Sequence, residues 1–136
     1  MFNYLTNYFM NFGILGEAKI AREHVVPAIL NAGHKVTHVG RRNPGQAALP
    51  EIYGNAIETD YETLINEPSV DAIYNPLPNH LHVPYSIEAL KANKHVLCEK
   101  PVALNLDELS QLENAAKDSK AFFYEAFMVR SHPQWH

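Results

Sequence analysis

The amino-acid sequence predicts an α/β fold in which a doubly wound parallel sheet is covered by helices on both faces. Short apolar runs alternate along the chain with segments of helical periodicity. Most of the runs are apolar rather than alternating between apolar and polar residues, which is typical of strands that are buried on both sides. A chain of 136 residues, 46% of them hydrophobic and 19% charged, is sufficient for one domain with its own core.

The first half of the chain predicts three strands and two helices. An apolar strand at Phe12–Leu15 ends at a glycine and is followed by a helix. Pro27 falls inside that helix, so we expect a kink there or a later helix start. The second strand is Lys35–Val39, a small third strand is expected at Ala56–Ile57, and a short helix at Tyr61–Ile65.

The second half repeats the alternation of strand and helix. A buried strand at Ala72–Asn75 leads into a turn with two prolines and then into a helix from about His82 to Ala92. The next strand is His95–Cys98, a helix follows at Asp107–Ala116, and the last strand is Phe122–Phe127. We therefore expect a sheet of five or six strands.

The two ends of the chain predict different roles. Residues 1–9 contain no basic residue and no continuous apolar stretch, so we expect a disordered extension rather than a secretory signal. Residues 10–128 hold all the predicted strands and helices. Residues 129–136 follow the last strand and include Pro133, so we expect them to begin a C-terminal domain that is missing from this chain.

Charge and cysteine content exclude several classes of protein. Eleven basic against fifteen acidic residues give a net charge of −4, so the chain lacks the basic surplus expected for nucleic-acid or anionic-membrane partners. The single cysteine, Cys98, forms no internal disulfide, and we expect a buried, inert thiol in a cytoplasmic protein. No apolar run is long enough to cross a bilayer, and the eight histidines lack the spacing of a metal site.

The loop after the first strand, GEAKIA, resembles the phosphate-binding turn G-x-G-x-x-G/A. Gly16 allows the tight turn, Ala18 stands at the second glycine position, and Ala21 allows close helix packing. Lys19 and Ile20 begin the helix whose free N–H groups would face a phosphate. The alternative is a plain turn between a strand and a helix.

The loop after the second strand carries Arg41 and Arg42 and no carboxylate. Proteins specific for NAD place an acidic residue here, whereas arginine forms charge-assisted hydrogen bonds with the 2′-phosphate of NADP. The sequence therefore favours NADP over NAD as cofactor. The alternative is a solvated pair of arginines on the surface.

Four segments, GILGEAKIA, YNPLPNHLH, HVLCEKP and EAFMVRSHPQ, occur in the order and at the spacing of a known family. Together they make Met10 to about Gln134 similar to the Gfo/Idh/MocA oxidoreductases, especially the branch with NADP-dependent xylose and dihydrodiol dehydrogenases. The resemblance implies that residues 10–128 form a Rossmann-like NAD(P)-binding domain. The implied reaction transfers hydride between NADP(H) and a sugar, polyol or diol.

The resemblance also implies roles for individual residues. Lys100 would be catalytic, because an ammonium near the reacting oxygen stabilises alkoxide charge or relays a proton. Glu99 would hold either Lys100 or the nicotinamide ribose. His82 matches the histidine that opens the following helix and would be a cofactor-binding residue. Arg130 would lie near the cofactor, although Val129 replaces the usual aromatic residue before it. The loop residues expected along the cofactor are Asn75, Pro76, Leu77 and Asn79.

The resemblance also implies a second domain that carries the substrate pocket, and we expect this domain to be missing from this chain. We therefore keep a second hypothesis from another class, a catalytically inactive nucleotide-binding remnant or module. We also expect an exposed apolar patch where the second domain would dock, which would make a homo-oligomer possible.

Overall fold

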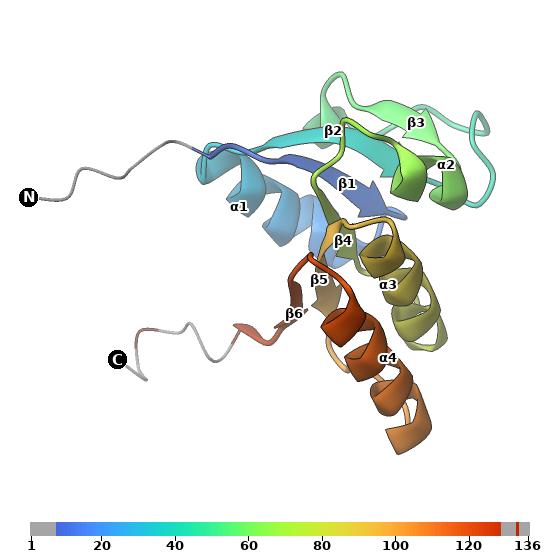
Figure 1. Ribbon diagram of the computed structural model, residues 1–136. Coiled ribbons are helices and arrows are strands. Elements are labelled where there is room, and N and C mark those ends of the chain that lie inside the picture. Colours follow the sequence, from blue (N-terminus) through green and yellow to red (C-terminus); the bar gives the residue numbers. More distant parts are fainter. Residues whose placement is uncertain (1–7, 129–132, 134–136) are drawn as a thin grey trace, which may run out of the picture.

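The computed structural model describes residues 8–128 and 133, and these residues form one parallel sheet with helices on both sides (Figure 1). Its six strands lie in the order β3-β2-β1-β4-β5-β6. This is a doubly wound, Rossmann-like topology, as the sequence predicts. The strands are β1 (Asn11–Leu15), β2 (Lys35–Gly40), β3 (Ile57–Thr59), β4 (Ala72–Asn75), β5 (His95–Glu99) and β6 (Phe123–Ala126).

Three helices cover one face of the sheet: α2 (Tyr61–Asn66), α3 (His82–Lys91) and α4 (Leu106–Asp118). Apolar side chains from these helices and from the central strands pack into one continuous core on this face. All four residues of β4 are buried. The absence of polar alternation in β4 follows from this, because neither face of the strand meets water.

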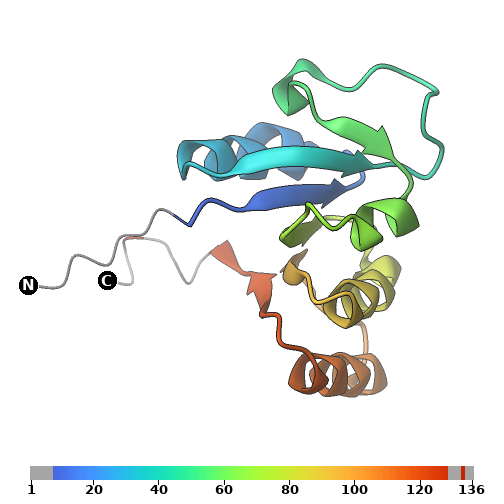
Figure 2. The same ribbon diagram turned by 45° about the horizontal axis from the view of Figure 1, so that its top comes forward.

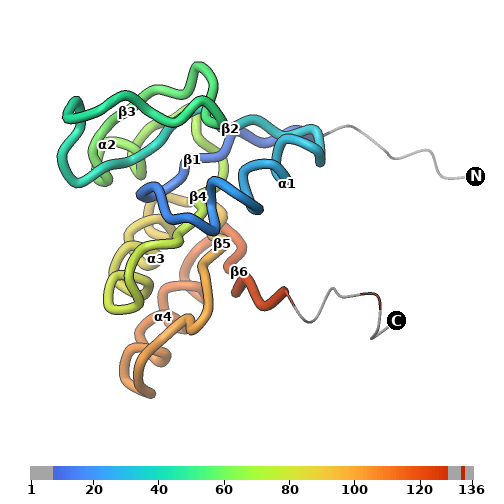
Figure 3. Tube along the Cα trace, turned by 180° about the vertical axis from the view of Figure 1, so that it is seen from behind, coloured from blue at the N-terminus to red at the C-terminus, as the bar shows by residue number. Residues whose placement is uncertain are grey.

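The opposite face is covered by α1 (Val26–Asn31), which Figure 3 shows from behind. A wider, π-helical turn, η1 (Ala21–Val25), directly precedes it. The sequence predicted a disturbance at Pro27, and the structure shows it as this wider turn rather than as a later start. Proline has no N–H to donate to the carbonyl four residues earlier, so the regular hydrogen-bond ladder is interrupted at this point.

Helix α2 sits unusually close to the end of β2. A Cβ atom added to Gly40 would lie 2.9 Å from a ring carbon of Tyr61, so only glycine allows this approach. The contact places the Tyr61 ring beside the loop that follows β2. The fold thus brings an aromatic side chain from a later helix to the loop that carries the two arginines.

Two predicted elements, a strand and a helix, differ from the structure by two residues at one end. Strand β3 lies at Ile57–Thr59, one to two residues later than expected, because it is an edge strand in which only the first residue is apolar. Ile57 is itself 60% exposed, and the two residues after it are polar, so the strand carries little apolar signal. Helix α4 begins earlier and ends later than predicted. Its start is set by Asn105, whose side chain accepts a hydrogen bond from the Glu108 N–H at 2.9 Å. The prediction of this helix used the spacing of apolar residues, which gives no information about a polar capping residue.

The edge of the sheet at β6 exposes large apolar side chains, and whether a second domain would dock there stays a prediction. Phe122, Tyr124 and Met128 are 77%, 55% and 64% exposed. Tyr124 pairs with Leu97 of β5 and therefore faces the same side of the sheet as α1. The expectations for residues 1–9 and 129–136 fall mostly outside the described part of the chain and stay predictions. Among the described helices, none is long and apolar enough to cross a membrane.

Candidate functional site

The loops that follow β1, β2 and β4 meet at one edge of the sheet, because parallel strands all end on the same side (Figure 2). A cavity of about 330 Å³ opens between the first two loops, and one of about 630 Å³ extends to the third. Gly16, Glu17, Arg42 and Tyr61 line both cavities. The two are therefore parts of one crevice at the point where the strand order reverses, which is where doubly wound sheets bind their ligands.

Gly16 forms the turn at the base of this crevice. Its φ of +77° is a conformation that residues with a Cβ atom rarely adopt. A Cβ there would also come within 3.1 Å of the Leu77 side chain. The Gly16 N–H donates to the Gly40 carbonyl at 2.7 Å, which fixes the turn to the end of β2. The predicted role of Gly16 as a tight turn is thus consistent with its geometry.

The helix after this turn points its free end into the same region. Its first helical hydrogen bond joins the Arg22 N–H to the Ala18 carbonyl at 3.2 Å. The N–H groups of Lys19, Ile20 and Ala21 consequently have no acceptor within the helix. Ala21 itself is fully buried, as its predicted packing role requires. Unpaired N–H groups at a helix N-terminus favour the binding of phosphate.

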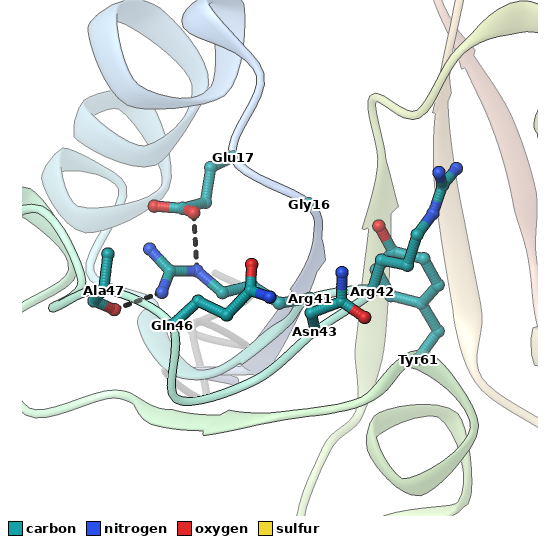
Figure 4. A pocket seen from close by; sticks show the side chains of 8 residues that line it. All are labelled: Gly16, Glu17, Arg41, Arg42, Asn43, Gln46, Ala47 and Tyr61. Atoms are coloured by element: carbon teal, nitrogen blue, oxygen red, sulfur yellow. Dashed lines mark hydrogen bonds and ion pairs between the residues drawn. The ribbon is translucent and has the colours of Figure 1, made fainter.

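The side chain of Arg41 is held by the protein itself (Figure 4). Its Nε donates to Glu17 at 2.5 Å and one terminal nitrogen donates to Glu58 at 2.8 Å. The same guanidinium also donates to the carbonyl oxygens of Ala47 and Ala48. The hydrogen bond with Glu17 is the main reason why the pKa of Arg41 is raised above its usual value. Most of the donors of Arg41 are therefore already used.

Arg42 is more open than its neighbour. It is exposed and lines both parts of the crevice together with Tyr61. Figure 4 shows the Arg42 side chain pointing away from Arg41 and running beside Tyr61. Of the two arginines that the sequence singled out, Arg42 is the one whose charge faces the crevice without a carboxylate partner among the described residues.

The loop after β4 is braced from within by Asn75, which is fully buried. Its side-chain amide donates to the His82 carbonyl at 3.1 Å, and its oxygen accepts from the Leu77 N–H at 3.2 Å. Pro76 and Leu77 are buried but line the crevice, whereas Asn79 is exposed. The structure thus gives Asn75 a supporting position and leaves Pro76, Leu77 and the exposed Pro78 as the members of this loop that line the crevice.

His82 joins the loops after β4 and β5. The ring is 1% exposed, with Nε2 lying 2.7 Å from the Leu77 carbonyl and Nδ1 lying 2.8 Å from the Pro101 carbonyl. Both partners are main-chain acceptors. The histidine that the sequence marked as a cofactor residue therefore fixes the relative position of two loops.

Glu99, the last residue of β5, is buried and bonded to a tyrosine of the neighbouring strand. The Tyr74 hydroxyl donates to its carboxylate at 2.6 Å, a distance typical of a charge-assisted bond. The pKa of Tyr74 is raised, first because the ring is buried and then because of this bond, so the hydroxyl stays a donor. The sequence left two roles open for Glu99, a contact with Lys100 or one with the nicotinamide ribose. Among the described residues, Glu99 forms no ion pair with Lys100.

Lys100 follows Glu99 and is exposed. Within residues 8–128 and 133, ion pairs involve Lys19 and Arg41 and none involves Lys100. Arg130 lies outside the described residues. Cys98 is fully buried, which confirms the expectation of a buried thiol. Burial raises the pKa of this thiol to about 12, which favours low reactivity. In the described part of the chain, no group of three or more His, Cys, Asp or Glu residues has metal-binding geometry.

Sequence reasoning missed four residues of this region: Glu17, Glu58, Tyr61 and Tyr74. Glu17 and Glu58 come from the loop after β1 and from β3, and they meet Arg41 only because β1, β2 and β3 are neighbours in the sheet. The one available signal was the acidic residue directly after Gly16 in the phosphate-binding turn.

The strand order, the turn at Gly16 and the free helix end define a dinucleotide-binding Rossmann domain. The model of a protein family described as "Oxidoreductase family, NAD-binding Rossmann fold" matches residues 10–127. The chain belongs to this family, the Gfo/Idh/MocA oxidoreductases.

Individual relatives agree with this assignment. The chain is 41% identical to an uncharacterised oxidoreductase of Rhizobium meliloti and 37% identical to an NADP⁺-dependent D-xylose 1-dehydrogenase of Haloferax volcanii, covering 93% and 91% of this chain. It spans 39% of the length of each relative. A crystal structure of a 3-ketoreductase from Actinomadura kijaniata with NADP and TDP-benzene superimposes with a TM-score of 0.84 at 34% identity, over 93% of this chain and 41% of that one.

Proposed function

We propose that this chain is the cofactor-binding part of an enzyme that transfers hydride between NADP(H) and a sugar, polyol or diol. The observation that carries the proposal is the crevice in which the Gly16 turn, a free helix N-terminus and the exposed Arg42 guanidinium lie together. The relative of known activity named above is an NADP⁺-dependent dehydrogenase, and the related ketoreductase structure contains NADP.

The residues present fit a dinucleotide. The positive φ at Gly16 and the closeness of Leu77 leave no room for a side chain at the turn. The N–H groups of Lys19 and Ile20, with the Cβ of Ala18 beside them, would hold the pyrophosphate. Arg42 would bind the 2′-phosphate more readily than Arg41, because the donors of Arg41 are already engaged.

When bound, the nicotinamide supplies or accepts the hydride. The residues of this chain would orient the nicotinamide. Pro76, Leu77 and Asn79 would lie along the cofactor, and Glu99 would face its ribose. Lys100 would be the catalytic residue, donating a hydrogen bond or a proton to the reacting oxygen of the substrate. Asn75 and His82 would support the loops, and Arg130 remains a predicted contact from the sequence.

Cofactor binding is tested by titrating the full chain with NADPH and with NADH and following the fluorescence of the reduced nicotinamide. We expect NADPH to bind more tightly. Replacing Arg42 with alanine removes charge-assisted hydrogen bonds of about 1.5–3 kcal/mol, so NADPH should bind about 10- to 100-fold more weakly while NADH changes less. The control is Lys117→Ala, which removes one positive charge from α4. Absence of binding of either nucleotide at millimolar concentration would refute the proposal.

Catalysis is tested separately from binding. We expect oxidation of aldoses or diols with NADP⁺ by the protein, and loss of turnover with retained NADPH binding in Lys100→Ala. Binding without turnover by the unsubstituted chain on the whole substrate panel would favour the alternative, a nucleotide-binding module.

A further inference from the structure

One carboxylate lines the crevice where the 2′-phosphate would bind, and a second lies behind it on Arg41. Glu17 lines both cavities, and its side chain is 26% exposed. Glu58 stands behind Arg41, with a side chain that is 20% exposed. Both glutamates pair with Arg41, and the side chains of Glu17, Glu58, Arg41 and Arg42 together carry no net charge, so this wall is much less cationic than the sequence RRN suggests.

The position of Glu17 is set by the backbone. Leu15 pairs with Gly40 in the sheet, and the Gly16 N–H donates to the Gly40 carbonyl. The Arg41 N–H donates to the Thr59 carbonyl at 2.8 Å. These bonds hold the loops after β1 and β2 side by side, so the contact between Glu17 and Arg41 is a consequence of the sheet register.

The contact also limits what Arg41 can do. A phosphate that approached Arg41 would have to compete with the Glu17 carboxylate for Nε and would lie close to that negative charge. By contrast, a ribose 2′-hydroxyl can donate a hydrogen bond to a carboxylate. In NAD-specific domains an acidic residue at the end of the second strand accepts this hydrogen bond. Glu17 reaches the same region from the first loop instead.

We propose that Glu17 is a specificity-determining residue that weakens the discrimination between NADP(H) and NAD(H). It opposes the 2′-phosphate by its charge, and it offers the 2′-hydroxyl of NAD(H) an acceptor. Arg42 supplies the attraction for the phosphate on the other side of the crevice. This inference rests on the proposed function, because it refines which dinucleotide the same crevice prefers.

The test compares Glu17→Gln with the unsubstituted chain in titrations with NADPH and NADH. Removing the charge should tighten NADPH binding roughly tenfold, the effect of one close like charge, and should leave NADH binding equal or weaker. The ratio of the two dissociation constants therefore rises in favour of NADPH. Folding is checked by the melting midpoint, which we expect to change little because the Arg41 side chain keeps Glu58 and Ala47 as partners.

Two further variants separate the possible causes. Glu113→Gln on α4 makes the same change in net charge far along the sequence and should leave both dissociation constants unchanged. Glu17→Asp keeps the charge and should keep the ratio within about threefold of the original, in line with the unchanged charge. An unchanged ratio in Glu17→Gln, or an equal rise in Glu17→Asp, would overturn this inference. Failure of the unsubstituted chain to bind either nucleotide would instead refute the proposed function.

Discussion

Replacing Tyr74 with phenylalanine removes one hydroxyl group from the interior and leaves the Glu99 carboxylate without the hydrogen bond that it accepts there. Tyr74 has no exposed surface, and the bond is 2.6 Å long. A hydrogen bond to a charged group contributes about 1.5–3 kcal/mol to stability, and a buried carboxylate that loses its partner keeps its desolvation cost. We therefore expect Tyr74→Phe to lower the free energy of unfolding by about 2 kcal/mol.

The same apolar cluster contains a matched control. Tyr53 is 3% exposed, and its buried hydroxyl has no hydrogen-bond partner among the described residues. Burial is the main reason that the pKa of Tyr53 is raised to about 12. Removing this hydroxyl loses no bond and relieves an unsatisfied group, so Tyr53→Phe should leave stability unchanged or raise it by up to about 1 kcal/mol.

Thermal and urea unfolding at pH 7, followed by circular dichroism, measure both variants against the unsubstituted chain. A loss of about 2 kcal/mol corresponds to a melting midpoint lowered by about 6 to 10 °C for a domain of this size. Equal losses in the two variants would show that the aromatic hydroxyls act only through packing. An unchanged midpoint in Tyr74→Phe would refute the assigned bond to Glu99.

Three other outcomes follow from local contacts. Cys98, with a thiol pKa raised to about 12 by burial, should not react with a disulfide reagent at pH 8 unless the protein is unfolded, and rapid native labelling would contradict its burial. The pKa of Glu58 is lowered, chiefly by the hydrogen bond from the Gly45 N–H, so the stability that Glu58 contributes is present above pH 4.5 and is lost as the pH falls through the lowered pKa. In Glu58→Gln, the resistance to urea should therefore fall less between pH 6 and pH 3 than in the unsubstituted chain. Parallel pH profiles of the two proteins would contradict this contribution. Asn105→Ala removes the side chain that accepts from the Glu108 N–H, so the free energy of unfolding measured in urea should fall by about 1 kcal/mol. Asn105→Asp keeps an acceptor at this position and should keep most of that free energy.

The sequence predicts the order of elements and the loops that carry chemistry, because both follow from local patterns. Short apolar runs mark buried strands, and the glycine after the first run marks the turn at Gly16. These signals need only a few neighbouring residues. The fold class followed from them and the family resemblance from the four loop segments, and the structure and the comparisons confirm both.

Contacts between strands were not predictable in the same way. A strand that is apolar on both sides gives no sign of which face each side chain occupies, so the position of Tyr74 beneath Glu99 could not be read from the run AIYN. Nor could the pairing of Arg41 with Glu17 and Glu58, because it depends on the order of three strands. The sequence correctly located the loops but not the balance of charge between them.

The surroundings of Lys100 illustrate how these long-range contacts bear on function. The residue before it, Glu99, is tied to β4 through Tyr74, and the carbonyl of the residue after it, Pro101, contacts the His82 ring. The backbone on both sides of Lys100 is thus anchored, while the lysine side chain itself is exposed. A proton-donating group needs a fixed attachment point and access to its substrate. Since both anchors lie within residues 8–128, the backbone around Lys100 is held by the Rossmann domain itself, as the proposed proton-donating role requires.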